Sequence, residues 1–587
     1  MKLKLVKSKI ATTAYVQKSV REGAKVTTKA VARLGTLEEI ALREGCADPL
    51  AWCRAKVAEM TAAENDRHKA VVVQYHPGRR VKSGSGALRL GGGLLLAGLY
   101  RSLGLPVICS DIQRAGKSSY DLNEILRTLV MGRILFPGSK RSTLEQSRRL
   151  IKAPGFAAEQ MYRSLSLLSG SIDTVQAEVF RQSKSLAERR TGVIFYDCTN
   201  YYFETDEEDG LRRRGKSKEG RPNPIVQMGL FMDYDGIPLA FVIFPGNASE
   251  QPTLKPLEEK LAEDFDLTDF VVSTDAGLGS EDNRRYNTTE GREYICVQSL
   301  PQLSEKDRLM AIAPQGWRVA VRDRGLGPVD GRDPGRDVFN LDELDMQRER
   351  HTKFYKEILV EKRLNGKGPR MERVIVTYCH DFALYLRHKR EQRLKKAEKI
   401  VKSKSTKSRQ SQQDPRRYVE TLYCTREGEL AEHIAMSIDG KVVEQEQQLD
   451  GFYAYGTSLD DNAVDILRIR GFHGEIEHLF RTTKSFLEAR PVYLQRDERI
   501  RSHFLICFLA MTILKILQKK LDLKDLTIDR LITTLREFNF NYVSGVGYTP
   551  LFERNELTDR LQEIAGLKLD YEIITKREMG RIYKSLM

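Results

Sequence analysis

The sequence predicts an α/β fold whose core is a mixed β-sheet. Three β-prone segments follow one another between residues 192 and 244, and two more lie on either side of a short helix between 269 and 298. Consecutive strands with short connections pair antiparallel, whereas a helical crossover restores parallel pairing. The pattern also predicts a helical N-terminal region, and a stretch with strand-like runs after the core strands.

The elements of the core follow from apolar runs and turn residues. Gly236 and Pro238 mark the turn between the second and third strands. In chain order we expect strands at 192–198, 226–233 and 239–244, a helix at about 252–264, a strand at 269–275, a short helix from Ser280, and a strand at 293–298.

Other regions surround this core. Residues 1–90 open with a predicted hairpin that turns at Glu22-Gly23 and leads to a helix. Residues 91–190 show apolar spacing of three and four, which is typical of helices. The remaining predicted regions are the first part of the core (191–300), an insertion with strand-like runs and a basic helix (301–457), a helix returning to the core (458–497) and a helical C-terminal region (498–587).

Two aspartates directly follow predicted strands. The run VIFY leads into Asp197, and the run FVVST leads into Asp275. A strand-end aspartate on its own is more often a cap or turn residue than a ligand. Burying an unpaired carboxylate costs on the order of several kcal/mol, however, so such a residue usually has a cation or a set of donors as its partner. With a third carboxylate, the pair predicts a site for two divalent ions about 4 Å apart, which suits phosphodiester chemistry.

Glu477 supplies a third carboxylate from a predicted helix. At about 100° per residue, His473, Glu477, Arg481 and Lys484 fall within about 80° and form one polar stripe. An apolar stripe runs beside it, formed by Phe472, Ile476, Phe480 and Leu487. Glu477 at the rim of the core can reach a metal while Arg481 and Lys484 reach phosphates. The alternative is a solvated helix face with ion pairs along it.

The charge of the chain favours a polyanionic partner. Its net charge is +15 and its pI is near 9.2. Basic residues cluster at Arg212, Arg213 and Arg214, and again between residues 387 and 417, and we expect the first cluster to contact DNA. Charge alone does not separate a DNA-binding protein from a ribosomal or membrane-surface protein.

Several classes of protein are disfavoured because the sequence lacks the motifs that are typical of them. The eight cysteines include no Cys-x2-Cys pair, which argues against a zinc site or a disulfide framework and predicts a reducing, cytoplasmic location. The segment SGSGALRLGGG contains neither a complete phosphate-loop motif nor GxGxxG, so no nucleotide cofactor is expected. We take Leu94–Leu99 as the most apolar stretch, and it is too short to span a membrane.

The chain resembles the DDE transposases of bacterial insertion sequences, in particular the IS-four type. Their signature is Tyr-x2-Arg-x3-Glu-x6-Lys, and Glu477 and Lys484 match its second half. Arg470 stands in the place of the tyrosine and His473 in the place of the arginine. Three further segments of the sequence also resemble this family, namely IEHLFRTTKSFLEARPVYLQRDERIRSHFLICFLAM, DGFYAYGTS and TAYVQKSVREGAKVTTKAVARLG. The resemblance therefore covers most of the chain.

This resemblance implies a ribonuclease-H-like core, interrupted by a β-rich insertion between its second aspartate and its glutamate. It implies cleavage at the ends of a mobile element and strand transfer into target DNA, with Mg²⁺ as cofactor and Mn²⁺ as a substitute. Asp197 would bridge two ions, and Asp275 and Glu477 would complete their shells. Lys484 and Arg481 would position phosphates, and His473 would also contact the DNA. Double-stranded DNA and a second copy of the chain are the partners it implies, and segments before the core are candidates for recognising the element ends.

Three alternatives remain open at this point. A catalytically inactive descendant would bind DNA without cutting it, with Arg470 and His473 as signs of decay. A nuclease of the same fold would cut DNA but never join it. A haloacid-dehalogenase-like phosphatase would use the IFYDCT segment as its nucleophile loop, although that family normally has an aspartate where Thr199 stands.

Overall fold

The computed structural model describes residues 1–8, 11–22, 25–67, 72–73, 76–78, 80, 86–289, 291–322, 338–364, 367–403, 409, 414–424 and 433–586. The chain divides into two compact units. The first comprises residues 1–85 and 544–546, and the second comprises residues 86–543 and 547–587.

The first unit is a small antiparallel sheet with two helices. Strands β1 (Lys2–Lys7), β2 (Thr12–Glu22) and β3 (Lys25–Thr36) pair in sequence order. The pairing of β2 with β3 confirms the predicted hairpin, whose turn at residues 23–24 lies outside the described residues, whereas β1 was not predicted. Helices α1 (Leu37–Glu44) and α2 (Pro49–Arg67) follow, and Thr36 caps α1 in a capping box with Glu39.

The second unit begins with helices, as the apolar spacing predicts. They are α3 (Gly92–Ser102), α4 (Leu105–Ala115), α5 (Leu122–Leu135), α6 (Lys140–Ser147), α7 (Ala158–Ser169) and α8 (Ile172–Ser183). These helices share one apolar cluster with the C-terminal helices. The C-terminal helices are α16 (Asp497–Leu521), α17 (Ile528–Glu537), α18 (Glu556–Ala565) and α19 (Lys576–Leu586).

A small sheet joins the two ends of this unit. Strand β4 (Leu88–Leu90) pairs with β16 (Asn539–Val543), which pairs with β17 (Gly547–Pro550) and then β18 (Ile574–Thr575). The first residues of the helical region are therefore held by backbone hydrogen bonds to the C-terminal region.

The central sheet has the predicted mixed pairing. Its core strands are β5 (Val193–Tyr202), β6 (Ile225–Asp233), β7 (Pro238–Pro245), β8 (Phe270–Thr274) and β9 (Arg292–Val297), with α9 (Leu254–Phe265) and α10 (Glu281–Tyr286) between them. The order is β9-β8-β5-β6-β7. Strands β5, β6 and β7 pair antiparallel, whereas β8 and β9 run parallel to β5. This confirms the mixed α/β fold and agrees with the ribonuclease-H-like core that the resemblance implies.

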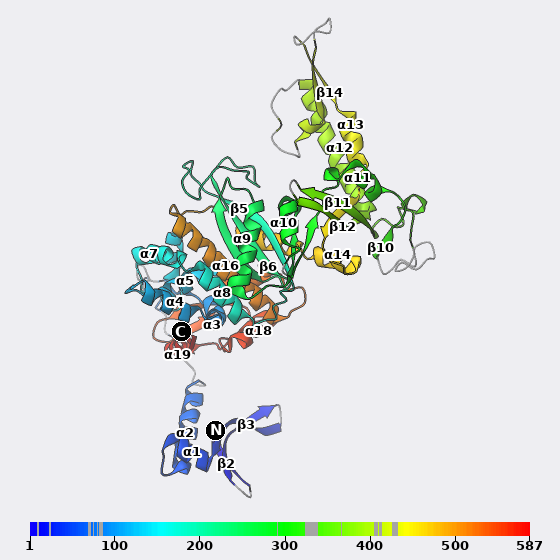
Figure 1. The fold of residues 1–587 in the computed structure, drawn as a ribbon. Helices are drawn as coiled ribbons and strands as arrows, with labels where there is room; N and C mark the ends of the chain where they lie inside the picture. Colours follow the sequence, from blue (N-terminus) through cyan, green and yellow to red (C-terminus); the bar gives the residue numbers. More distant parts are fainter. Residues whose placement is uncertain are drawn as a thin grey trace. The chain divides into compact units, whose positions relative to one another are not determined.

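The insertion extends the same sheet instead of forming a separate one. Strands β10 (Arg318–Val321), β11 (Lys353–Leu364), β12 (Lys367–Cys379) and β15 (Phe452–Thr457) continue it beyond β9, to give nine strands in the order β10-β11-β12-β15-β9-β8-β5-β6-β7 (Figure 1). The other insertion elements are α11 (Glu305–Ile312), α12 (His380–Ser403), the pair β13 (Val419–Cys424) and β14 (His433–Ile438), and α13 (Gly440–Gln447). The predicted basic stretch 387–417 includes residues outside those described.

Helices cover both faces of the core strands. Phe195 and Tyr201 of β5 join the apolar cluster that includes α16, whereas Tyr196 and Cys198 join a second cluster with α9. Side chains alternate between the faces of a strand, so odd-numbered residues of β5 face α16. The two helices α14 (Ala463–Gly471) and α15 (Gly474–Ser485) precede α16, and α15 contributes Ile476 to the first cluster.

One helix among the described residues, α16, is long and apolar enough to cross a membrane, and the bent pair α3–α4 meets the same criteria. The longest apolar stretch is therefore in α16 and not at Leu94–Leu99. The apolar window of α16 is 94% buried inside the protein, as in a core helix of a globular protein.

Candidate active site

The register of two parallel strands places the predicted aspartates side by side. Phe195 of β5 is paired with Ser273 of β8, so Asp197 and Asp275 are each two residues further along and point to the same face. Asp275 follows β8 with an extended backbone (φ −82°, ψ 166°), as predicted. Asp197 is not at a strand end, because β5 continues to Tyr202 with Asp197 opposite Leu230 of β6. The pairing of β5 with β8, in contrast, ends at Phe195, close to Asp197.

Helix α15 brings the glutamate to the same face. Ile476, Leu479 and Phe480 are buried in the cluster that contains Phe195, and Glu477 lies between them on the exposed side of the helix. A cavity of about 430 Å³ is lined by both aspartates, Glu477, Arg481 and Lys484. The structure therefore brings together the three predicted carboxylates and two of the predicted basic residues.

Asp197 is a carboxylate with little compensation from the protein. Its pKa is raised to about 6, chiefly by burial, with Lys218 opposing this effect and the negative charge of Asp275 adding to it. Its Oδ1 accepts a hydrogen bond from the backbone N–H of Cys198 at 2.7 Å. A cation at this carboxylate would offset the cost of its ionised form.

Asp275 is held by the two residues that depart from the family signature. Arg470 Nη2 donates to Asp275 Oδ1 at 2.5 Å, and His473 Nε2 lies 3.1 Å from the same oxygen. Burial raises the pKa of Asp275, but the hydrogen bonds and charges of His473 and Arg470 outweigh it and bring the pKa to about 2. Both partners are buried, so His473 lies behind the carboxylate and does not line the cavity.

The predicted phosphate-contacting residues differ in their surroundings. The pKa of Lys484 is lowered to about 8, chiefly by burial and also by the charge of Lys218, while Asp197 has the opposite effect. Its Nζ lies 3.5 Å from Glu219 Oε1 and 5.4 Å from the ring centre of Tyr201. Arg481, which lies one turn of α15 after Glu477, is exposed.

The carboxylates suit Mg²⁺ by their chemistry, since hard divalent cations prefer oxygen ligands. The partly uncompensated carboxylate of Asp197 is the observation that fits a cation best. Within the described ranges, however, no three acidic, His or Cys side chains converge closely enough to hold an ion. Oδ1 of Asp275 is occupied by Arg470, and Glu477 points toward solvent. Binding a metal would thus require these two side chains to turn toward Asp197.

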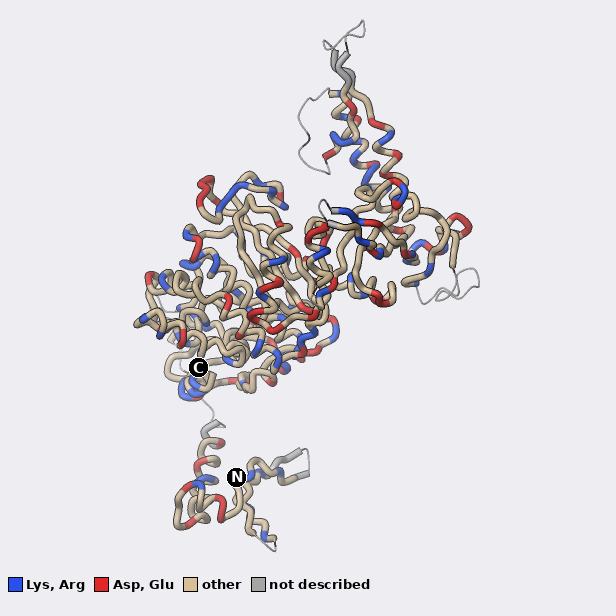
Figure 2. Tube along the Cα trace, viewed as in Figure 1, with Lys and Arg blue, Asp and Glu red and all other residues tan. Residues whose placement is uncertain are grey.

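The arginine cluster in the loop between β5 and β6 is only partly exposed. Arg212 is buried and pairs with both carboxylate oxygens of Asp209, at 2.7 and 2.6 Å. Arg213 is half-buried, and Arg214 is exposed and donates to Glu208 at 3.2 Å. Acidic and basic residues lie next to each other along this loop (Figure 2). The buried Arg212 is therefore not placed to contact DNA, whereas Arg214 is accessible.

Three charged residues of the cavity were not predicted from sequence, namely Lys218, Glu219 and Arg490. Lys218 Nζ donates to the carbonyl oxygen of Cys198, next to Asp197, and lies 3.5 Å from Glu250 Oε1. The signal for Lys218 and Glu219 was their place in a charged loop that follows directly after the strand of Asp197. Arg490 follows α15 closely, but nothing in its local sequence separates it from other exposed arginines.

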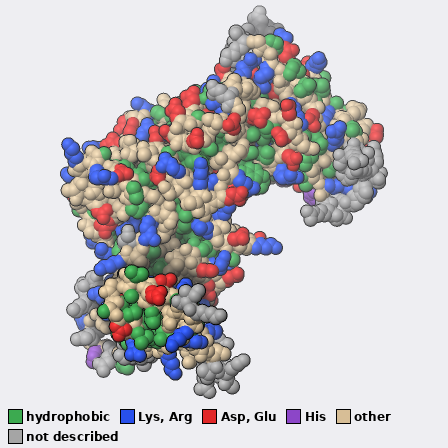
Figure 3. Space-filling model, turned by 60° about the horizontal axis from the view of Figure 1, so that its bottom comes forward, with side chains coloured by type: hydrophobic (Ala, Val, Ile, Leu, Met, Phe, Trp, Pro, Cys, Tyr) green, Lys and Arg blue, Asp and Glu red, His purple; other side chains and the backbone are tan. Residues whose placement is uncertain are grey.

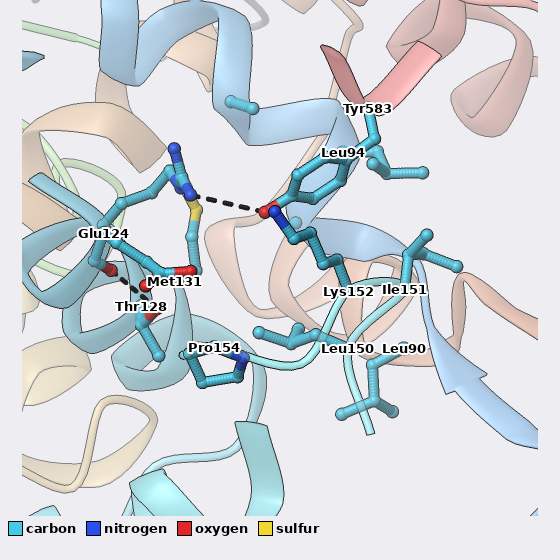
Figure 4. A pocket seen from close by; sticks show the side chains of 13 residues that line it. Leu90, Leu94, Glu124, Thr128, Met131, Leu150, Ile151, Lys152, Pro154 and Tyr583 are labelled. Carbon is cyan, nitrogen blue, oxygen red and sulfur yellow. Dashed lines mark hydrogen bonds between the residues drawn. The ribbon is translucent and has the colours of Figure 1, made fainter. Parts of the chain in front are cut away.

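A second pocket lies away from these carboxylates, among α3, α5 and α19. Its wall is mostly apolar, and Arg127 donates to the Tyr583 hydroxyl at 3.3 Å across it (Figure 4). Its volume of about 50 Å³ is far below the ~300–1,000 Å³ of typical ligand sites. We therefore place the chemistry at the carboxylate cavity.

A mixed sheet of this order, with three carboxylates and basic residues in one cavity, defines a candidate site for metal-dependent nucleic-acid chemistry. A family model described as the transposase DDE domain matches residues 190–513, which is more than half of the chain. The protein belongs to this family.

The chain is also similar to a solved structure of the piggyBac transposase, a synaptic complex with hairpin DNA. The sequence identity is 7%, the TM-score is 0.34, and the match covers 84% of each chain. No curated protein matches the chain.

Proposed function

We propose that this protein is an active DDE transposase of the IS-four type, which cuts DNA at the ends of a bacterial insertion sequence and transfers the freed strands into target DNA. The observation that carries the proposal is that Asp197, Asp275 and Glu477, widely separated in sequence, line one cavity together with Lys484 and Arg481. The family match supports this class of reaction, and the cavity supplies residues suited to it.

Each residue of the cavity has a role in this proposal. Asp197 would hold both Mg²⁺ ions, and Asp275 and Glu477 would each complete the shell of one. The ions would activate the attacking oxygen and stabilise the leaving oxygen of the phosphodiester. Lys484 and Arg481 would hold the DNA backbone in line for attack by water during cleavage and by a 3′-hydroxyl during transfer. Mn²⁺ would serve as a substitute.

The replaced signature residues favour an active enzyme over an inactive descendant. Arg470 and His473 both contact Asp275, and they lower its pKa and so keep it ionised at neutral pH, as a metal ligand must be. Random decay would not be expected to place an arginine and a histidine on a catalytic carboxylate. A nuclease that cuts without joining is the second candidate, because the same residues would serve cleavage alone. The family match disfavours the phosphatase alternative.

The partners proposed are double-stranded DNA and a second copy of the chain. Two element ends must be held together for transfer, which a homodimer provides. The active site itself would read only the DNA backbone, so recognition of the ends would come from base contacts elsewhere, for which the helices before the core are our candidates. We also propose that the protein acts in the bacterial cytoplasm, bound to the nucleoid.

The test is incubation of the purified protein with Mg²⁺ or Mn²⁺ and a labelled duplex that carries the DNA flanking its own gene. We expect cleavage at the element ends, and strand transfer into a plasmid target. Asp197→Ala and Glu477→Ala should each abolish cleavage, since either loses a metal ligand, while binding of the duplex should persist.

Three outcomes would contradict the proposal. DNA binding without any cleavage by the unaltered protein would support the inactive descendant. Cleavage that survives Glu477→Ala would show that another residue is the third carboxylate. Cleavage without transfer would support the nuclease alternative.

A further inference from the structure

We propose that Lys484, Arg490 and Arg221 form a binding site for a DNA backbone phosphate, and that the carboxylate of Glu219 occupies this site while DNA is absent. The inference rests on the proposed function, because it assigns a ligand to the rim of the same cavity. It adds two arginines and an intramolecular competitor that neither the family signature nor the sequence pattern indicated.

The contacts of Glu219 define the site. Its Oε1 contacts Arg490 Nη1 and lies 3.5 Å from Lys484 Nζ, and its Oε2 lies 3.8 Å from Arg221 Nε. Three cations therefore surround one carboxylate, which leaves two positive charges uncompensated within this cluster. Glu219, Lys484 and Arg490 all line the cavity that contains the catalytic carboxylates.

The side chains of the cluster are arranged as a binding site more than as a random surface patch. Those of Lys484 and Arg490 are only 12% and 25% exposed. The guanidinium of Arg221 lies 4.0 Å from the ring centre of Tyr202, and that of Arg490 lies 6.0 Å from the same ring. Stacking on one aromatic ring restricts both arginines, which lowers the entropic cost of binding an anion.

A phosphodiester matches this site better than a carboxylate does. Both carry one negative charge on two oxygens, so a phosphate can replace Glu219 contact for contact. DNA brings further phosphates on either side, which a single carboxylate cannot supply and which the surplus positive charge of the cluster favours. Phosphates near the scissile bond must also lie beside the metal-binding carboxylates, and this cluster does.

Glu219 is placed to leave when DNA arrives. It belongs to the loop between β5 and β6, and its backbone N–H donates to the Ser217 hydroxyl at 3.3 Å. The next residue, Gly220, has a positive φ of 67° with open space around it, so the loop can turn there. The carboxylate would thus act as a stand-in for phosphate that weakens the binding of DNA until a well-placed backbone displaces it.

The test measures binding of a fluorescein-labelled duplex carrying the element end to the full-length protein, by anisotropy in EDTA so that no cleavage occurs. We expect Glu219→Gln to bind about fivefold more tightly, because its neutral side chain competes less well for the cations. Glu207→Gln is the matched control, since Glu207 is an exposed residue of the same loop and its change alters the net charge equally. We expect that control to stay within about twofold.

A second variant tests the cations. Arg490→Ala should weaken binding several-fold, Arg490→Lys should restore part of the loss, and Glu219→Gln combined with Arg490→Ala should show no gain over Arg490→Ala alone. Thermal unfolding of each variant shows whether it is folded. Competition by inorganic phosphate at constant ionic strength separates a site for free phosphate from one for the DNA backbone, and we expect no displacement of DNA at millimolar phosphate.

The experiment distinguishes a failure of this inference from a failure of the proposed function. If the unaltered protein binds no DNA, the transposase proposal itself fails. If it binds DNA and Glu219→Gln behaves as Glu207→Gln does, the inference about Glu219 is wrong. A gain from Glu219→Gln that persists without Arg490 would overturn the assignment of Arg490, and displacement by millimolar phosphate would overturn the assignment to the DNA backbone.

Discussion

At the scale of single residues, the site contrasts two aspartates on neighbouring strands. Asp275 has Arg470 and His473 within 3.1 Å, whereas Asp197 has one backbone donor, and the charges of Lys218 and Asp275 act on it in opposite directions. Their pKa values therefore move apart, to about 2 and about 6. The protein thus compensates the ionised form of Asp275 more fully than that of Asp197.

This contrast predicts a pH-dependent stability for the metal-free protein. The pKa of Asp197 is raised above its unfolded value, so ionising it costs folding free energy, and stability falls as the pH rises from about 4 to about 6. Asp197→Asn removes this cost and should be more stable by up to about 3 kcal/mol above pH 6, with little difference near pH 4. Urea unfolding in EDTA at both pH values measures it.

Metal addition provides the control for this prediction. Mg²⁺ should stabilise the unaltered protein above pH 6 and leave Asp197→Asn unchanged, because a ligand stabilises only the state that binds it. Equal stabilisation of both proteins would mean that Asp197 is not a metal ligand.

At the scale of elements, the insertion is tied to the core by a buried carboxylate. Glu372 of β12 is fully buried and accepts hydrogen bonds from Arg284 of α10 at 2.7 Å and from the Tyr294 hydroxyl of β9. Arg370 and Lys362 lie 3.4 and 3.7 Å from it. The network links strands of the insertion to elements of the core at a point where both belong to one sheet.

Removing this carboxylate should destabilise the second unit strongly. Glu372→Ala leaves Arg284 buried without its main partner, and we expect a loss of about 3–5 kcal/mol in the free energy of unfolding. Glu361→Ala on the neighbouring strand β11 is the control, because Glu361 pairs with the exposed Arg363. Denaturant unfolding followed by circular dichroism compares the two. A loss no larger than that of the control would show that the network does not hold the insertion to the core.

The elements that sequence predicted well are those formed by local pattern. The hairpin strands β5 to β7 and helix α9 follow from nearby apolar runs and the turn at Gly236, and they lie within a few residues of the expected bounds. The pairing of β9 with β15 joins residues about 160 positions apart, so no local pattern reveals it. Contact of Arg470 with Asp275 spans 195 positions and was missed for the same reason. The burial of Arg212 was also not predicted, although in this case the contact is local, because its partner Asp209 is only three residues away in the sequence.

At the scale of the whole molecule, the chain carries a net charge of +15. Figure 3 shows Lys and Arg side chains spread among Asp and Glu over the face that it draws. The placement of a few Lys and Arg side chains near the carboxylates would therefore matter more for DNA binding than the overall charge.

Salt dependence of DNA binding tests this view. Each phosphate neutralised by a Lys or Arg contributes about −0.9 to the slope of log K against log salt. Lys484→Met should make that slope shallower by about 1 and weaken binding to all sequences alike. Titrations by anisotropy in EDTA at several salt concentrations measure the slope. An unchanged slope would mean that Lys484 does not contact a phosphate.

The continuous nine-stranded sheet limits how this chain can be shortened. A deletion of residues 301–457 would remove β15 and leave the backbone groups of β9 unpaired along a fresh edge of the sheet. Such open edges are templates for pairing with other chains, so the trimmed protein would aggregate instead of yielding a minimal catalytic core. A smaller version of this enzyme would need a new strand, or a charged or proline-containing β9, to close that edge.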